Sequence, residues 1–241
     1  MILFDNRILY QNSDCLVVNK LKGESAQGGK DGIVNLPKEL KLFLNTDFVQ
    51  AVHRIDVPVT GCVLFALTNK ALVFLNNAFS GEGAVPIGKK YWAIAEKPSL
   101  LLSDNTEQLS ERELPTRGEL VHWIEINAGK NKSFAYNEDS PGRKKAALRY
   151  NITGEGKNYL FMEIELLSGR HHQIRAQLAA AGLHIKGDIK YGAKRSEKDG
   201  GIRLHARFLS FPNPLKKTER IGVTADPPVL DNLWTEFIKN V

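Results

Sequence analysis

Two apolar runs decide the fold class of this chain: AALRYNIT at residues 146–153 and YLFMEIELL at residues 159–167. They are separated only by the Gly-, Lys- and Asn-containing turn at residues 154–158. A short turn between two β-prone runs predicts a β-hairpin. Further strands are predicted at residues 15–19, 62–67, 89–98, 119–127, 203–211 and 220–225.

Helical segments are predicted between these strands, at residues 34–48, 69–79, 168–182 and 230–239. Thr68 is expected to cap the second helix and Ser168 the third, which Gly182 would end. Residues 129–143 are predicted to form a long polar loop. Hairpins mixed with isolated helices indicate an α+β class, with α/β elements on a largely antiparallel sheet.

Composition places the chain among ordinary globular proteins. Its length of 241 residues is enough for one large domain or two small ones. Of these residues 42% are hydrophobic and 25% are charged, as is usual for a folded protein. Cys15 and Cys62 each sit inside an apolar run, so we expect buried thiols and no disulfide framework. No apolar stretch is long enough to span a bilayer, and the N-terminus lacks the pattern of a secretory leader. We therefore expect a cytoplasmic protein without membrane contacts.

Positive charge is concentrated in the last third of the chain. Residues 170–220 contain twelve Lys and Arg but four Asp and Glu, although the whole chain carries only +6. Such a concentration is compatible with a polyanionic partner such as RNA, and equally with a solvated basic face.

The tetrapeptide His53-Arg54-Ile55-Asp56 lies in a turn ahead of a predicted buried strand. An aspartate held ionised by an arginine is suited to act as a nucleophile or a base. The alternative is an aspartate that only caps its turn.

The segment SGRHHQIR at residues 168–175 presents two arginines and two histidines near a predicted helix start. An arginine there can meet a phosphate or an aspartate, or can simply be a solvated cap residue. A zinc-dependent hydrolase would also need His184, His205 and Asp188, because the adjacent histidines do not share one helix face. Asp188 is instead expected to be structural, bonding its own backbone in a tight loop.

Lys89-Lys90-Tyr91 places a tyrosine at the head of a predicted strand. A tyrosine can stack against a base that has left its helix and assist a proton transfer, or it can be an ordinary packed strand residue.

The order of these segments resembles one known family across nearly the whole chain, the RluA-type RNA pseudouridine synthases. The matching segments are VVNKLKG (17–23), HRID with the following TG and LFALT (53–68), KKYWAI (89–94), SGRHHQIRAQLAAAG with GDIKYG (168–192) and LHARFLSFPNP (204–214). The resemblance implies the pseudouridine synthase fold, a mixed and mostly antiparallel sheet with a central cleft flanked by helices and loops. It also implies a single catalytic domain over residues 1–241, without a separate N-terminal RNA-recognition domain.

The resemblance further implies isomerisation of uridine to pseudouridine in structured RNA, either tRNA or ribosomal RNA. The family's catalytic aspartate falls on Asp56, its base-stacking tyrosine on Tyr91 and its aspartate-pairing arginine on Arg170. Asp56 would attack C1′ of the ribose or remove a proton from C2′. Neither a metal nor an organic cofactor is implied.

RNA contacts and the oligomeric state complete the expectation. Arg54 matches the residue that takes the place of the extruded base, and no obligatory protein partner is implied, which suits a monomer. The positions expected to contact RNA are His53, Arg54, Arg143, Lys144, Lys145, Arg175, Lys186 and Lys190. The family usually has HRLD followed by TSG, whereas this chain has HRIDVPVTG. That departure leaves a catalytically inactive RNA-binding protein on the same scaffold as the alternative.

Overall fold

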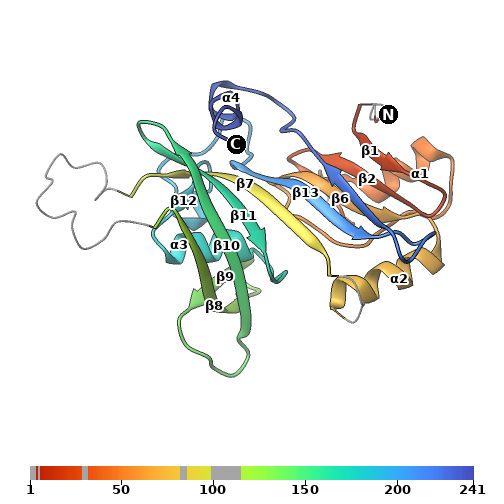
Figure 1. Ribbon diagram of the computed structural model, residues 1–241, viewed down its shortest axis with the longest axis horizontal. Coiled ribbons are helices and arrows are strands. Elements are labelled where there is room, and N and C mark those ends of the chain that lie inside the picture. The colour runs from red at the N-terminus through yellow and green to blue at the C-terminus, as the bar shows by residue number, and fades with distance from the viewer. Residues whose placement is uncertain (1–3, 5, 29–31, 82–85, 99–114) are drawn as a thin grey trace, which may run out of the picture. The chain divides into compact units, whose positions relative to one another are not determined.

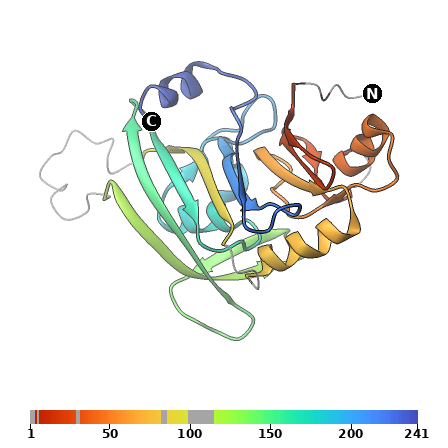
Figure 2. The same ribbon diagram turned by 45° about the vertical axis from the view of Figure 1, so that its right-hand side comes forward.

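The computed structural model describes residues 4, 6–28, 32–81, 86–98 and 115–241. The chain divides into two compact units, of which the first contains residues 1–90 and 205–229 and the second contains residues 91–204 and 230–241. Two strands, β7 (Gly88–Glu96) and β13 (Leu204–Pro212), cross the boundary between these ranges. Figures 1 and 2 show the elements of both units.

The sheet of the first unit has the order β1-β2-β6-β13, with β14 paired to β13 and β5 paired to β6. Most neighbours are antiparallel, but β6 and β13 are parallel, with Thr60 opposite His205. A separate parallel pair is formed by β3 and β4. The bounds are β1 Ile8–Gln11, β2 Cys15–Lys20, β3 Glu24–Ser25, β4 Val34–Asn35, β5 Gln50–Ala51, β6 Thr60–Ala66 and β14 Arg220–Thr224.

Helices α1 (Leu36–Leu44) and α2 (Asn69–Ser80) belong to the first unit. The Thr68 hydroxyl accepts the Ala71 N–H, so the predicted N-cap of α2 is confirmed. Helix α2 packs on β6, and the core beneath it contains both cysteines as buried free thiols, as predicted.

The second unit has the strand order β7-β11-β10-β8-β9, with β12 paired to β7. The predicted hairpin is confirmed as β10 and β11, an antiparallel pair. Its other elements include α3, which packs against β8 and β9, and the closing helix α4 (Figure 1). The bounds are β8 Arg117–Asn127, β9 Lys132–Tyr136, β10 Lys144–Glu155, β11 Tyr159–Leu166, α3 Gln173–Ala180, β12 His184–Ile185, a 3-10 turn at Ile189–Tyr191 and α4 Asn232–Ile238.

Two expectations about single elements are wrong. Residues 129–143 are not one long loop, because β9 lies within them and pairs with β8. The third helix does not begin at Ser168: it begins at Gln173, after His172 in a left-handed conformation with φ 51°. Ser168 instead donates from its hydroxyl to Gln173 Oε1 at 2.9 Å. The α+β class with a mixed, mostly antiparallel sheet is nevertheless confirmed.

Across the described ranges, no helix combines the length and the apolar character that crossing a membrane requires.

Candidate active site

The tetrapeptide His53–Asp56 lies between β5 and β6 in the first unit and leads into a turn over residues 56–59. Arg54 is exposed and Asp56 is partly exposed. The backbone N–H of Val59 donates to the Asp56 carbonyl at 3.0 Å and closes the turn. A carboxylate carried by a closed turn is held in one position, as a catalytic nucleophile or base requires.

Lys20 fixes the backbone of the turn itself. Its side chain is 0% exposed. The ammonium group donates to the carbonyls of Leu21 at 2.8 Å, Val57 at 3.2 Å and Val59 at 2.7 Å. Burial lowers the pKa of Lys20 from 10.5 to about 7, although nearby carboxylates, including Asp56, favour its charged form. Lys20 therefore joins β2 to the backbone on both sides of Pro58, shortly after Asp56.

His53 anchors the start of the turn. Its ring stacks on Phe79 of α2 with a centroid distance of 5.0 Å, and its Nε2 accepts the Leu64 N–H at 3.1 Å. Burial, reinforced by the charge of Lys89, lowers the pKa of His53 to about 3, so the ring is neutral at pH 7. A neutral ring committed to these contacts brings no positive charge to RNA. We leave His53 out of the proposed RNA contacts for this reason.

His205 holds the end of the turn from the neighbouring strand. Its Nδ1 lies 2.8 Å from the Thr60 hydroxyl and its Nε2 lies 2.9 Å from the Ala225 carbonyl. A carbonyl can only accept, so Nε2 carries the proton and the Thr60 hydroxyl donates to Nδ1. Burial lowers the pKa of His205 to about 4, which keeps this neutral tautomer at pH 7.

Gly61 follows Thr60 and brings β6 close to β13. Its φ is +116°, and a Cβ atom at this position would lie 2.3 Å from the Ala206 carbonyl oxygen. Only glycine fits such a close approach between two backbones. The TG pair after the turn therefore has a structural reason, because a side chain at position 61 would meet the backbone of Ala206.

Arg170 and Tyr91 belong to the second unit, so their convergence with Asp56 stays a prediction. Tyr91 lies on β7 and is 8% exposed. Arg170 is exposed; its backbone N–H donates to Gln173 Oε1 at 2.9 Å and its Nε donates to the Lys145 carbonyl at 3.2 Å. Gln173 is thus the residue that shapes the arginine's loop, and sequence reasoning missed it.

Arg175 is committed to the interior of the second unit. It forms two bonds with the Asp188 carboxylate, at 2.6 and 2.7 Å, and it is 5% exposed. A buried bidentate pair of this kind is costly to break. We therefore leave Arg175 out of the proposed RNA contacts. Asp188 has the structural role expected for it, but the partner in this pair is an arginine side chain.

The other expected RNA-contacting cations differ in how they are held. Lys144 and Lys145 are exposed, and exposed Lys190 donates to the Asn131 carbonyl at 3.1 Å. Lys186 forms an ion pair with Glu197 and is mostly covered. Arg143 donates to Glu125 at 3.3 Å.

The histidines that the alternative of a zinc site would need have other partners. His171 and His172 stack on each other with a centroid distance of 3.8 Å, and His184 Nδ1 donates to the Tyr191 carbonyl at 2.7 Å. In the part of the chain that the structure describes, no three His, Cys, Asp or Glu side chains are arranged to hold a metal ion.

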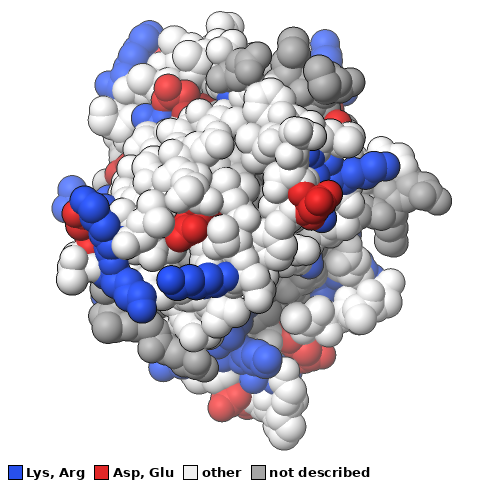
Figure 3. Space-filling model, turned by 90° about the vertical axis from the view of Figure 1, so that its right-hand side faces the viewer, with Lys and Arg blue, Asp and Glu red and all other residues white. Residues whose placement is uncertain are grey.

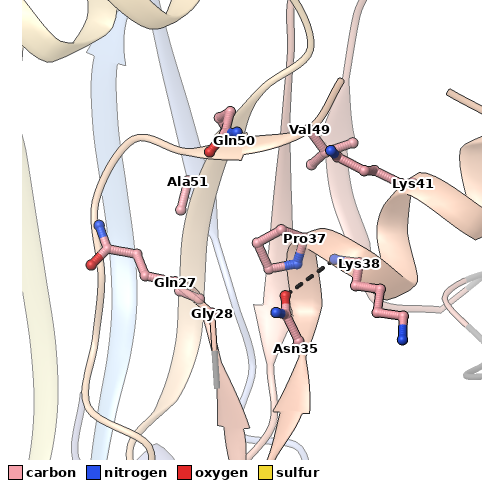
Figure 4. A pocket seen from close by; sticks show the side chains of 10 residues that line it. Gln27, Gly28, Asn35, Pro37, Lys38, Lys41, Val49, Gln50 and Ala51 are labelled. Carbon is pink, nitrogen blue, oxygen red and sulfur yellow. Dashed lines mark hydrogen bonds between the residues drawn. The ribbon is translucent and has the colours of Figure 1, made fainter. Parts of the chain in front are cut away.

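An open cavity of about 520 Å³ lies beside α1 in the first unit (Figure 4). Its lining includes the side-chain amides of Gln27, Asn35 and Gln50, together with Lys38 and Lys41. Asn35 uses its amide oxygen to accept the Lys38 N–H as the N-cap of α1. None of the predicted site residues lines this cavity. On the face shown in Figure 3, Lys and Arg are scattered among uncharged side chains and do not form one patch.

Residues 14–180 match the family described as RNA pseudouridylate synthase. The chain belongs to this family. Membership confirms the resemblance to RluA-type enzymes and makes the chain an isomerase that converts uridine in RNA into pseudouridine. The matched range includes Asp56, Tyr91 and Arg170.

Relatives in this family cover most of the chain. An uncharacterized RNA pseudouridine synthase of Zymomonas mobilis is 27% identical over 95% of this chain and 96% of its own length. The ribosomal large subunit pseudouridine synthase C of Buchnera aphidicola is 26% identical over 100% of this chain and 72% of its own length. The enzyme of the same name from Rickettsia prowazekii is 30% identical, over 78% of this chain and 56% of its own length.

Two solved human structures share the fold. RNA Pseudouridylate Synthase Domain Containing 4 superposes with a TM-score of 0.70 at 20% identity, over 98% of this chain and 93% of that one. RNA Pseudouridylate Synthase Domain Containing 1 gives a TM-score of 0.67 at 22% identity, over 93% and 84%. The pseudouridine synthase fold expected from the sequence is thereby confirmed.

Proposed function

We propose that this enzyme converts a specific uridine of ribosomal RNA or tRNA into pseudouridine, with Asp56 as its nucleophile or base. The observation that carries the proposal is the constrained turn around Asp56 in a chain of this family. Lys20, His53 and Thr60 fix the backbone on either side of this carboxylate, and support of this kind from surrounding residues preorganises a catalytic group.

The chemistry assigned to Asp56 needs no external reactant. Either its carboxylate attacks C1′ of the target ribose and breaks the bond to N1 of uracil, or it removes a proton from C2′ as that bond breaks. The uracil then turns, and C5 bonds to C1′. On the first route the ester bond between Asp56 and C1′ breaks in this step, and on the second C2′ takes its proton back from Asp56. The proton on C5 is then lost while N1 gains one. Product and substrate have the same composition.

Arg170 and Tyr91 have the chemical groups that the remaining steps need. A guanidinium beside the Asp56 carboxylate would keep it charged and aimed. A tyrosine ring would hold the detached uracil in a stack, and its hydroxyl is suited to a proton transfer. The target uridine must first leave its own stack, which costs a few kcal/mol and is easiest in a loop or bulge.

The substrate we propose first is large-subunit ribosomal RNA, because relatives from Buchnera and Rickettsia are named ribosomal large subunit pseudouridine synthase C. Arg54, Lys144, Lys145 and Lys190 are exposed cations that could contact its phosphates. Transfer RNA is the alternative substrate.

The test is direct. Purified enzyme is incubated with unmodified ribosomal RNA or tRNA. The RNA is then treated with a reagent that forms an adduct with pseudouridine but not with uridine, and the labelled nucleosides are counted by mass spectrometry. We expect pseudouridine with the wild type and with Asp47→Asn, an exposed aspartate outside the turn, and none with Asp56→Ala. Equal product from Asp56→Ala would overturn the assignment of the carboxylate.

A further inference from the structure

One face of the neighbouring strands β10, β8 and β9 in the second unit carries a cluster of aromatic rings. Trp123 on β8 lies opposite Tyr136 on β9 and opposite Lys145 on β10, so these three side chains leave the same face of the sheet. Phe134 lies opposite Glu125, two residues further along, on that face. We call the rings of Trp123, Phe134 and Tyr136 with the cations Lys132, Arg143 and Lys145 the aromatic face.

The opposite face of these strands is the one that packs in the core. Ile124 and Ala146 lie there at 2% and 1% exposure, in a cluster with Ala176 of α3. The rings of the aromatic face, by contrast, keep part of their surface exposed, and Val121 beside them is 38% exposed. A sheet face with partly exposed rings and a polar surround is typical of an interaction surface.

A cation accompanies each ring of the aromatic face. The Arg143 guanidinium lies 3.6 Å from the centroid of Tyr136 and the Lys145 ammonium 6.0 Å from that of Trp123. The Lys132 ammonium lies 5.4 Å from Phe134 and 4.9 Å from Tyr191 of the buried cluster. Arg143 is held in place by bonds to Glu125 at 3.3 Å and to the Glu138 carbonyl at 3.1 Å. Its planar group is therefore ordered against one ring before any ligand arrives.

The aromatic face borders the proposed catalytic arginine. Arg170 Nε donates to the carbonyl of Lys145, at 3.2 Å, and Ser168 Oγ accepts the N–H of Ala147, at 3.0 Å. Both contacts lie within the second unit. An RNA whose target uridine reaches Arg170 would therefore bring its neighbouring nucleotides to these strands.

We propose that the aromatic face binds unpaired nucleotides next to the target uridine. Bases stack on Trp123 and on the outer plane of the Arg143 guanidinium, while Lys145 and Lys132 contact phosphates. Neighbouring strands lie about 4.8 Å apart, so three strands span roughly 10 Å, which suits two or three splayed bases on a sheet. In paired RNA the bases are stacked inside the helix and cannot stack on protein side chains, so the occupant is single-stranded. This inference rests on the proposed function.

Tryptophan fluorescence gives a readout that a purely structural role would not produce. Trp92 and Trp234 are core residues at 5% exposure each, whereas Trp123 is partly exposed. Titrating the full chain with an unstructured uridine-rich oligonucleotide should quench the fluorescence of the wild type. Quenching should disappear in Trp123→Leu, although its two core tryptophans are unchanged.

Affinity measured by anisotropy separates stacking from charge. Trp123→Leu and Tyr136→Leu should each weaken binding about tenfold, while Trp123→Phe keeps a ring and stays near the wild type. The slope of log affinity against log salt concentration should not change in the ring variants. In Lys145→Gln this slope should decrease by about one, the value for one lost phosphate contact. Phe74→Leu is the matched control, because Phe74 in the first unit also carries a lysine over its ring, Lys217 at 5.6 Å.

The outcomes decide between this inference and its rivals. Wild-type affinity in both leucine variants, or tighter binding of a duplex than of the single strand, would overturn the stacking site. Thermal unfolding of each variant controls for misfolding, and Trp123→Phe keeps the test valid if the leucine variant does not fold. If pseudouridine formation requires Asp56 but ignores the rings, the aromatic face fails and the proposed function stands. If the rings bind RNA and no pseudouridine forms, the proposed function fails and the aromatic face stands as an RNA-binding surface.

Discussion

Lys20 supports the Asp56 turn with three hydrogen bonds from its buried ammonium group. Lys20→Met removes three donors and leaves the carbonyls of Leu21, Val57 and Val59 inside the protein without them. We expect the free energy of unfolding to fall by about 2 to 4 kcal/mol. Urea titration measures this, with Lys38→Met, which changes an exposed lysine, as the control. Equal stability of both variants would refute the role given to Lys20.

Protonation of buried histidines sets the acid limit of stability. His205 has a pKa of about 4 in the folded chain against an ordinary 6.5, so the unfolded chain binds the proton more readily between these values. The free energy of unfolding should therefore fall as the pH drops from 6.5 towards 4, by at most about 1.4 kcal/mol per pH unit from this residue. His53 acts with the same sign.

Comparison of unfolding curves across this pH window isolates His205. We expect His205→Gln to be less stable than the wild type near neutral pH, but with a shallower dependence on pH because one titrating group is gone. Parallel dependences in the two proteins would show that His205 binds its proton equally well in the folded and the unfolded chain, and would contradict its lowered pKa.

At the scale of elements, the approach of β6 to β13 is the feature most sensitive to a single atom. Gly61→Ala places a Cβ 2.3 Å from the Ala206 oxygen, so one of the two strands must move. We expect a loss of several kcal/mol in the free energy of unfolding. Gly200→Ala, with φ +73° and nothing within 4 Å, should cost only about 1 kcal/mol. Similar losses in denaturant titrations of both variants would contradict this reading of β6.

Elements with strong local signals could be predicted from the sequence, and those without them could not. The apolar runs of β10 and β11 and the Thr68 cap of α2 are local, and both predictions are confirmed. Strand β9 was missed because it has five residues, lies in polar surroundings and is recognisable only through its pairing with β8. Helix α3 begins at Gln173 and not at Ser168, because His172 adopts a left-handed conformation for which the neighbouring sequence gives no signal.

At the scale of the whole molecule, the motifs of the candidate site could be read from the sequence but their supports could not. HRID and SGR stand out as polar segments at predicted turns. Lys20 ends an apolar strand, and its bonds reach residues 37 and 39 positions away. The bond between Thr60 and His205 joins residues 145 positions apart. Such contacts exist only once the sheet has formed, so a linear pattern gives no signal for them.

The dependence of a cellular modification on Asp56 tests the central claim most directly. Pseudouridine is mapped at single-nucleotide resolution in ribosomal RNA and tRNA from cells that express the wild type, Asp56→Ala or Asp47→Asn at equal protein levels. We expect at least one site that is modified with the wild type and with Asp47→Asn and unmodified with Asp56→Ala. A modification pattern that is identical in all three strains would contradict a catalytic role for Asp56.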